Sequence, residues 1–117
     1  MNMEEDCIFC KMVNGDVPVT EVYDDDNFFA FLDNNPLVEG HTLIIPKRHY
    51  NTVLDMPSSL GGELLDAIKK VGFDLIKEGK AESINLAVIG EDVKHAHVHV
   101  IPRKDGDGVK VLSKEGK

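Results

Sequence analysis

Three histidines recur at two-residue spacing late in the sequence, in the segment His95-Ala96-His97-Val98-His99. Alternate side chains of an extended strand share a face, so the three imidazoles would gather on one exposed or cleft-facing surface. Such a surface could ligate a metal ion that keeps an open water position. Alternatively, one imidazole could attack a substrate while its neighbours bind and protonate it. The spacing alone does not decide between these two chemistries.

The chain has two cysteines, Cys7 and Cys10, in a Cys-x-x-Cys arrangement. A structural disulfide is the weakest explanation if the compartment is reducing. The arrangement is also typical of a redox pair, of half a metal site, or of two unrelated buried thiols. All three alternatives remain open from the residues themselves.

The composition indicates one acidic domain over residues 1–117, since this length leaves no room for a second core. With 13 basic and 21 acidic side chains the net charge is −8, which disfavours nucleic acid as a partner but not a small phosphorylated ligand. No stretch approaches the roughly 20 apolar residues of a membrane span, and the acidic start lacks the apolar core of a signal peptide. We therefore expect a protein without a membrane partner, located in the cytoplasm, or also in the nucleus if the cell has one.

The histidines and cysteines must be positioned by a small set of helices and strands. Apolar residues at steps of three and four predict a long helix over residues 58–80, which Ser58 or Ser59 would cap and Gly79 would end. A shorter helix is expected over residues 7–14. Five strands are predicted, over residues 20–24, 28–33, 41–46, 84–89 and 95–101. The pattern predicts an α+β fold: a five-stranded, mostly antiparallel sheet with one long and one short helix on one face.

Four segments resemble the histidine triad (HIT) family, in the order that family shows. They are Cys7-Ile8-Phe9-Cys10-Lys11, Ala30-Phe31-Leu32-Asp33, the segment from Gly40 to His49, and His95-Ala96-His97-Val98-His99-Val100-Ile101. They span nearly the whole chain, which implies a single HIT domain with the HIT-like fold. The branch that the sequence resembles most contains small nucleotide-binding proteins that act as dimeric nucleoside phosphoramidate hydrolases.

The resemblance assigns a role to each catalytic candidate. His97 would attack the α-phosphorus of a nucleoside phosphoramidate or a similar nucleoside monophosphate derivative, and water would then release the nucleotide from the histidine. His99 and His41 would donate hydrogen bonds to the phosphate oxygens. His95 would lie beside the leaving group or a metal ion.

The resemblance also implies a nucleotide pocket. Its residues would be Ile8, Phe9, Phe31 and Leu43 for the base, Asp33 for the ribose, and Gly90, Asp92, His97 and His99 for the phosphate. Strand alternation agrees with this, because Phe31 shares a face with Asp33, and His41 shares a face with Leu43. Without the resemblance, Phe9 and Leu43 could be ordinary core residues, and Asp33 could cap the turn that follows it.

A structural zinc ion is the one cofactor that the resemblance implies, with no organic cofactor. Its ligands would be Cys7, Cys10, His49 and His95, a tetrahedral set that leaves no position open. It would tie the N-terminal helix to the sheet. The alternative is two reduced buried thiols and a surface histidine.

The loop before the triad, residues 89–94, departs from the family pattern. It is shorter, and Glu91 and Asp92 stand where the family carries an amide and a hydroxyl. A carboxylate there would repel an ionised phosphate, which Lys94 would partly offset. We therefore expect nucleotide binding to survive better than the catalytic rate.

Several functions fit these residues. The leading hypothesis is a homodimer whose partner is a purine nucleotide or nucleoside phosphoramidate, which it hydrolyses. Cleavage of dinucleoside polyphosphates, as in another branch of the family, is a second hypothesis. A nucleotide-binding regulatory protein with weak turnover is a third, and metal-dependent hydrolysis through the triad is the least favoured.

Overall fold

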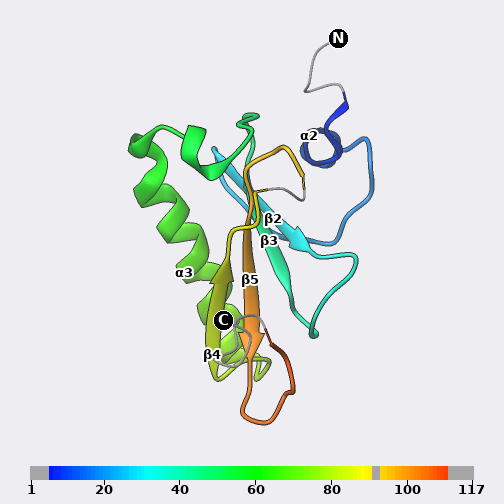
Figure 1. Cartoon of the computed structure of the whole chain (residues 1–117), viewed down its shortest axis with the longest axis vertical. Coiled ribbons are helices and arrows are strands. Elements are labelled where there is room, and N and C mark those ends of the chain that lie inside the picture. The colour runs from blue at the N-terminus through cyan, green and yellow to red at the C-terminus, as the bar shows by residue number, and fades with distance from the viewer. Residues whose placement is uncertain (1–5, 91–92, 111–117) are drawn as a thin grey trace.

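A five-stranded antiparallel sheet forms the centre of this computed structural model, which describes residues 6–90 and 93–110 (Figure 1). The strand order is β1-β2-β3-β5-β4, and each neighbouring pair is antiparallel. The strands are β1 (Glu21–Asp24), β2 (Phe28–Leu32), β3 (Thr42–Pro46), β4 (Ser83–Ala87) and β5 (Val98–Arg103). The predicted α+β class and the five-stranded sheet are therefore confirmed.

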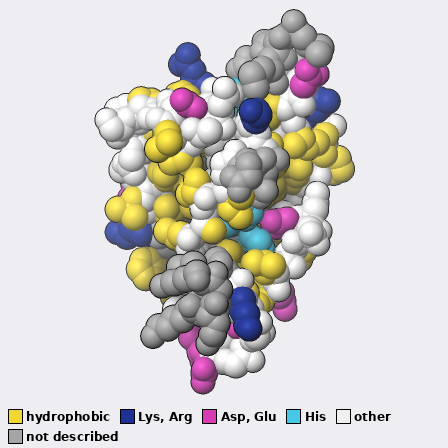
Figure 2. Space-filling view, viewed as in Figure 1, with side chains coloured by type: hydrophobic (Ala, Val, Ile, Leu, Met, Phe, Trp, Pro, Cys, Tyr) yellow, Lys and Arg dark blue, Asp and Glu magenta, His cyan; other side chains and the backbone are white. Residues whose placement is uncertain are grey.

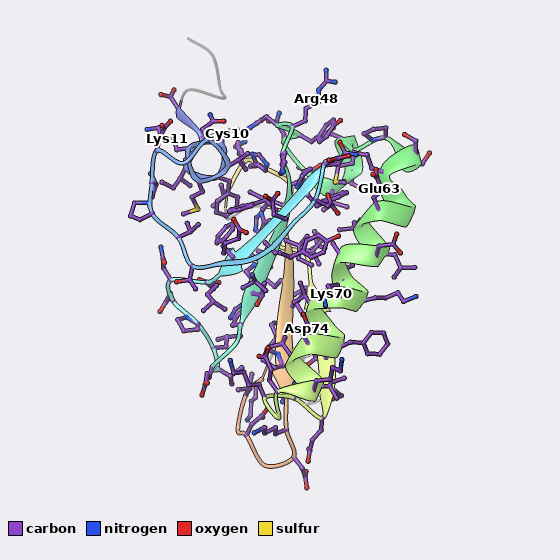
Figure 3. All side chains as sticks on the ribbon, turned by 180° about the vertical axis from the view of Figure 1, so that it is seen from behind. Cys10, Lys11, Arg48, Glu63, Lys70 and Asp74 are labelled. Atoms are coloured by element: carbon purple, nitrogen blue, oxygen red, sulfur yellow. The ribbon has the colours of Figure 1, made fainter. Side chains whose placement is uncertain are left out.

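Among the described residues, the short and the long α-helix cover opposite faces of the sheet. α2 (Ile8–Val13) packs in one buried cluster with Phe29 and Phe31, whereas α3 (Gly61–Lys77) packs in another with Phe28 and Ala30. Figures 1 and 3 show α3 on one side of the strands and α2, with the labelled Cys10, on the other. The prediction that both helices lie on one face is wrong. A strand that is apolar at four successive positions must be covered on both faces, because its side chains alternate.

Glycines with a left-handed backbone end both helices. Gly15 (φ 83°) follows α2 and Gly79 (φ 76°) follows α3. After each glycine the chain folds back onto its helix: Asp16 N donates to Lys11 O at 2.9 Å, and Lys80 N donates to Leu75 O at 2.9 Å. This is the Schellman arrangement, which satisfies carbonyls that the end of a helix leaves without partners. Both predicted helix ends are confirmed.

The start of the long helix differs from the prediction. Two short 3₁₀ helices, Val53–Asp55 and Ser58–Leu60, precede α3, which begins at Gly61. The expected serine cap is absent, because Leu60 is the N-cap residue and makes no side-chain capping bond. Among the described residues, no helix is both long and apolar enough to cross a membrane.

β5 begins at Val98, three residues later than predicted. His95 and His97 therefore precede the strand. The backbone between them is bonded to the segment after β3 and not to a neighbouring strand, since Ala96 N donates to Tyr50 O at 2.6 Å. The three histidines are also buried, with exposed fractions of 0, 4 and 9% for His95, His97 and His99. Of the two predicted settings, an exposed or a cleft-facing surface, the exposed one is wrong. His95 and His97 lie ahead of β5 and pack against Phe9 of α2, and only His99 lies in the strand.

Candidate active site

Four side chains that are far apart in the sequence converge beneath α2. They are Cys7, Cys10, His49 and His95, and their ligand atoms lie within 4.8 Å of one another. We call them the Cys/His cluster. Cys7 is the N-cap of α2, where its Sγ accepts from Cys10 N at 3.4 Å, so the first turn of the helix brings both thiols to one side.

The imidazoles of this cluster turn their Nδ1 atoms toward the thiols. His95 Nδ1 lies 3.3 Å from Cys7 Sγ and 3.4 Å from Cys10 Sγ, and His49 Nδ1 lies 3.3 Å from Cys10 Sγ. The Nε2 atoms face acceptors instead: the carbonyl of Pro46 at 2.8 Å for His95, and Asn51 Oδ1 at 3.0 Å for His49. Each Nε2 must therefore carry the proton, which leaves an Nδ1 lone pair directed at the centre of the cluster.

This donor set fits a tetrahedral zinc ion. At Zn–S distances of about 2.3 Å and Zn–N distances of about 2.0–2.1 Å, neighbouring ligand atoms lie roughly 3.5 Å apart. Three of the nitrogen–sulfur separations in the cluster are 3.3 to 3.4 Å, close to that value. The cluster is therefore a candidate metal centre with four protein ligands.

His97 is oriented by the same residue that completes the cluster. Its Nδ1 lies 2.8 Å from the carbonyl oxygen of His95, so Nδ1–H donates and Nε2 of the neutral ring holds a lone pair. The ring edge of Phe9 packs against it, with centroids 5.3 Å apart. His97 is thus held in the tautomer that a nitrogen nucleophile requires.

A second group of titratable side chains, Asp33, His41 and His99, lies at the other end of the row of imidazoles. We call it the Asp33 cluster. The backbone N–H of Leu37 donates to His41 Nδ1 at 3.1 Å, so that atom carries no proton. The proton of His41 is therefore on Nε2, which lies 2.9 Å from His99 Nδ1 and donates to it. This chain of bonds places the proton of neutral His99 on its Nε2.

The environment of His41 keeps it neutral. Burial lowers the pKa of His41 below its ordinary value, and Asp33, whose Oδ2 lies 3.5 Å from His41 Nε2, opposes that shift. Asp33 Oδ1 also accepts from the backbone N of Asn35 at 2.9 Å, so it caps the turn after β2. Because the imidazoles of this cluster bond to each other, their lone pairs do not converge on one point as those of the Cys/His cluster do.

The Asp33 cluster lines a cavity of about 440 Å³, which is within the range of small-molecule sites. Asp33, His41 and His99 line it together with Asn35, four apolar side chains and Lys110. Figure 2 shows histidine atoms at the surface in the middle of one face, beside an acidic side chain and among apolar ones. The ring of His97 is 5.3 Å from that of His99, centroid to centroid, so the candidate nucleophile lies next to this cavity.

The structure separates the predicted pocket residues into two groups. Phe9, Phe31 and Leu43 belong to the buried cluster between α2 and the sheet, and Ile8 is 40% exposed at its edge. Asp33 and His99 line the cavity instead, and Gly90 is exposed in the loop after β4. Asp92 lies outside the described residues. His99, which pairs with Leu43 across β3 and β5, is where the two groups meet.

Several groups that position the histidines have no counterpart in the sequence prediction. Two of them, the Pro46 carbonyl and the Leu37 N–H, are backbone atoms, so no side-chain pattern marks them. Asn51 follows His49 by two residues, a local spacing that could have indicated a partner for that ring. Lys110 is missed because it reaches the cavity only through the turn that follows β5.

Comparison with known proteins gives consistent matches. The HIT domain model matches residues 14–106. An uncharacterized HIT-like protein of Methanocaldococcus jannaschii is 42% identical over 109 residues, with 87% of this chain and 82% of that protein covered. An adenosine 5′-monophosphoramidase of Candida albicans is 32% identical over 108 residues, covering 85% of this chain and 71% of that protein.

Two further matches bear on chemistry and on metal. An adenylylsulfatase of Arabidopsis thaliana is 37% identical over 110 residues, with 90% of this chain but only 56% of that longer protein covered. The crystal structure of a zinc-bound histidine triad family protein from Mycobacterium smegmatis superposes with a TM-score of 0.85 at 32% identity, covering 92% of this chain and 82% of that one.

Proposed function

This chain belongs to the HIT-domain family, and on that premise we propose that it is a nucleotide-binding hydrolase that cleaves nucleoside phosphoramidates or related nucleoside monophosphate derivatives. The observation that carries the proposal is the hydrogen bond from His97 Nδ1–H to the His95 carbonyl, which leaves the Nε2 lone pair for attack. A relative named as an adenosine 5′-monophosphoramidase supports the same class of reaction.

The reaction has two displacements at the α-phosphorus. In the first, His97 Nε2 forms a bond to phosphorus while the P–N bond of the substrate breaks, and the leaving amine takes up one proton. In the second, water attacks the nucleotidyl-histidine, releases the nucleoside monophosphate and one proton, and restores His97. His99 Nε2–H, whose proton is positioned by His41, donates to a phosphate oxygen as negative charge develops there.

The nucleoside would lie across the two groups of pocket residues. The base would contact the edge of the buried cluster at Ile8 and Phe9, and the ribose hydroxyls would donate to Asp33. Phe9 packs against His97 at 5.3 Å between centroids, so a base at that edge brings the α-phosphate within reach of the nucleophile. Asp33 keeps this role beside its turn-capping one, because a carboxylate has acceptor capacity for both.

The Cys/His cluster is proposed to hold a structural zinc ion. The convergence of two thiols and two Nδ1 lone pairs supports this, as does the zinc-bound relative. When bound, the ion would supply a cross-link between α2 and the segment before β5, without an open position for substrate.

The test is hydrolysis of adenosine 5′-phosphoramidate by the purified chain, followed as release of AMP. We expect His97→Ala to lower kcat/KM by at least about 10³-fold, as loss of a nucleophile does. Lys70→Ala, an exposed change on α3, serves as the matched control and should leave the rate unchanged. Rapid quenching in alkali and mass spectrometry should find AMP attached to His97.

Two outcomes would contradict this proposal. Equal rates for the parent and His97→Ala would exclude His97 as the nucleophile. AMP binding without turnover of the phosphoramidate, of adenylyl sulfate or of a dinucleoside polyphosphate would favour a regulatory nucleotide-binding protein instead.

A further inference from the structure

The cavity beside the Asp33 cluster contains one lysine and no arginine among the described residues that line it, and that lysine is Lys110. The other ionisable groups there supply no positive charge. Asp33 is a carboxylate, and His41 accepts a hydrogen bond from a backbone N–H at Nδ1, which a protonated imidazole cannot do. Without Lys110, the described part of the cavity lining would be neutral to negative.

The backbone that leads to Lys110 is held by a network of hydrogen bonds. Arg103, the last residue of β5, donates through Nη2 to the carbonyl of Val109 at 2.8 Å, and Val109 N donates to Asp107 Oδ1 at 3.0 Å. Arg103 and Asp107 also form a two-point ion pair, through Nε at 2.8 Å and Nη2 at 2.9 Å. Arg103 Nη1 donates to Asn85 Oδ1 of β4 at 2.6 Å, which anchors the turn to the sheet. Both backbone groups of the residue before Lys110 are therefore fixed.

A phosphate that reacts with His97 must lie next to His99, whose ring is one neighbour along the row and lines the cavity. That phosphate carries negative charge, and this charge increases on its oxygens as His97 attacks. Neutral imidazoles offer it hydrogen bonds but no countercharge. Among the described residues that line the cavity, Lys110 is the side chain that can supply one.

We infer that Lys110 is a phosphate-binding residue of this site, held over the cavity by the Arg103–Asp107 turn and selecting nucleotides over nucleosides. This inference rests on the proposed function for the identity of the ligand. It extends the set of phosphate-binding groups beyond the histidines, to a residue on the turn after β5. It also accounts for how a chain with a net charge of −8 can bind an anion.

The experiment compares AMP with adenosine by calorimetry, using the full chain as purified. Lys110→Ala should raise the Kd for AMP by about 5- to 20-fold, near the lower end of the range for a charge-assisted hydrogen bond because Lys110 is exposed. The Kd for adenosine should change by less than about twofold. Lys110→Arg keeps the charge and should retain most of the affinity for AMP. Added salt should weaken AMP binding more in the parent than in Lys110→Ala.

Lys104→Ala is the matched control. Lys104 lies in the same turn and is exposed, but it does not line this cavity, and its bond to Asp107 comes from the backbone N. Removing its charge should leave both affinities as in the parent. A similar loss of AMP affinity in Lys104→Ala would show a general charge effect and overturn the inference.

Other outcomes separate this inference from the proposed function. An unchanged Kd for AMP in Lys110→Ala, or an equal loss for AMP and adenosine, would overturn the role of Lys110 even if the enzyme hydrolyses phosphoramidates. Lys110-dependent AMP binding in a chain that releases no AMP from any substrate would overturn the hydrolysis and support the inference. If the parent binds neither AMP nor adenosine, both are wrong.

Discussion

The Cys/His cluster and the Asp33 cluster each contain two histidines, yet they differ in where the imidazole lone pairs point. In the Cys/His cluster, each Nε2 donates outward and each Nδ1 lone pair faces the thiols. In the Asp33 cluster, a backbone N–H starts a chain in which one ring donates to the next. The first arrangement suits a metal ion, whereas the second fixes protons beside a cavity. The partner of the second ring nitrogen, more than the residue type, decides the chemistry of a histidine here.

His95 links the Cys/His cluster to the candidate nucleophile, His97. Its ring belongs to the Cys/His cluster, while its carbonyl oxygen accepts from His97 Nδ1 at 2.8 Å. A change in the cluster should therefore act on stability first and on the nucleophile second. A change in the Asp33 cluster should act on catalysis without altering the metal content.

The largest expected effect comes from removing a thiol of the Cys/His cluster. Cys10→Ser should lower the free energy of unfolding by at least roughly 3 kcal/mol, since a metal that binds only the folded chain stabilises it. For a domain of this size we expect the Tm to fall by roughly 10–20 °C. Thermal unfolding and elemental analysis for zinc measure the two quantities together.

The neighbouring Lys11 provides the control for that change. It is an exposed residue of α2, and Lys11→Ser should leave the zinc content intact with a small change in Tm. The parent protein can be tested in the same way, by zinc content after dialysis and by Tm with and without a strong chelator. If it contains no zinc and its Tm is the same in both conditions, the Cys/His cluster is not a metal site.

An intermediate effect is expected in the Asp33 cluster. His41→Ala removes the donor that holds the proton of His99 on Nε2, and we expect kcat/KM for adenosine 5′-phosphoramidate to fall by about 10- to 100-fold. His41→Gln retains an amide N–H and should recover part of the rate. The zinc content of both variants should equal that of the parent, and a loss of zinc would show that the two clusters are not independent.

The smallest effect is a difference in the pH dependence of stability. Burial lowers the pKa of His41 in the folded chain, and Asp33 and His99 are the ionisable groups that face it. Below about pH 6.5 the unfolded chain protonates this histidine while the folded chain does not. The free energy of unfolding should therefore decrease as the pH falls through that range, and level off once folded His41 is also protonated.

Urea unfolding of the parent and of His41→Gln at pH 7.5 and 5.5 measures this contribution, because the other histidines contribute to both proteins. The parent should lose more stability than the variant between the two pH values. A larger loss in the variant would mean that Asp33 outweighs burial and that His41 is charged in the folded chain, which would contradict its position in the hydrogen-bonded chain.

The elements of the fold were largely predictable from local patterns. The apolar periodicity of α3 and the glycines after both helices predicted where the helices end, because a left-handed residue is a local requirement. The placement of the helices was not predicted, although Phe28, Phe29, Ala30 and Phe31 contained the signal, since a run buried on both faces needs a cover on each. The late start of β5 depends on the bond from Ala96 to Tyr50, a contact that spacing does not show.

The sequence by itself determined which side chains are available for chemistry: the three histidines of the triad, the two cysteines, His41, His49 and Asp33. Their types and spacing, with the resemblance, were sufficient to predict the family and the residues that come together in each cluster. Only the tertiary structure decided which nitrogen of each ring holds the proton, that His95 acts through both its ring and its carbonyl, and that Lys110 reaches the cavity. These features depend on hydrogen bonds such as the one between His41 and His99, 58 residues apart. Such bonds exist only once the register of the sheet has brought the two strands together.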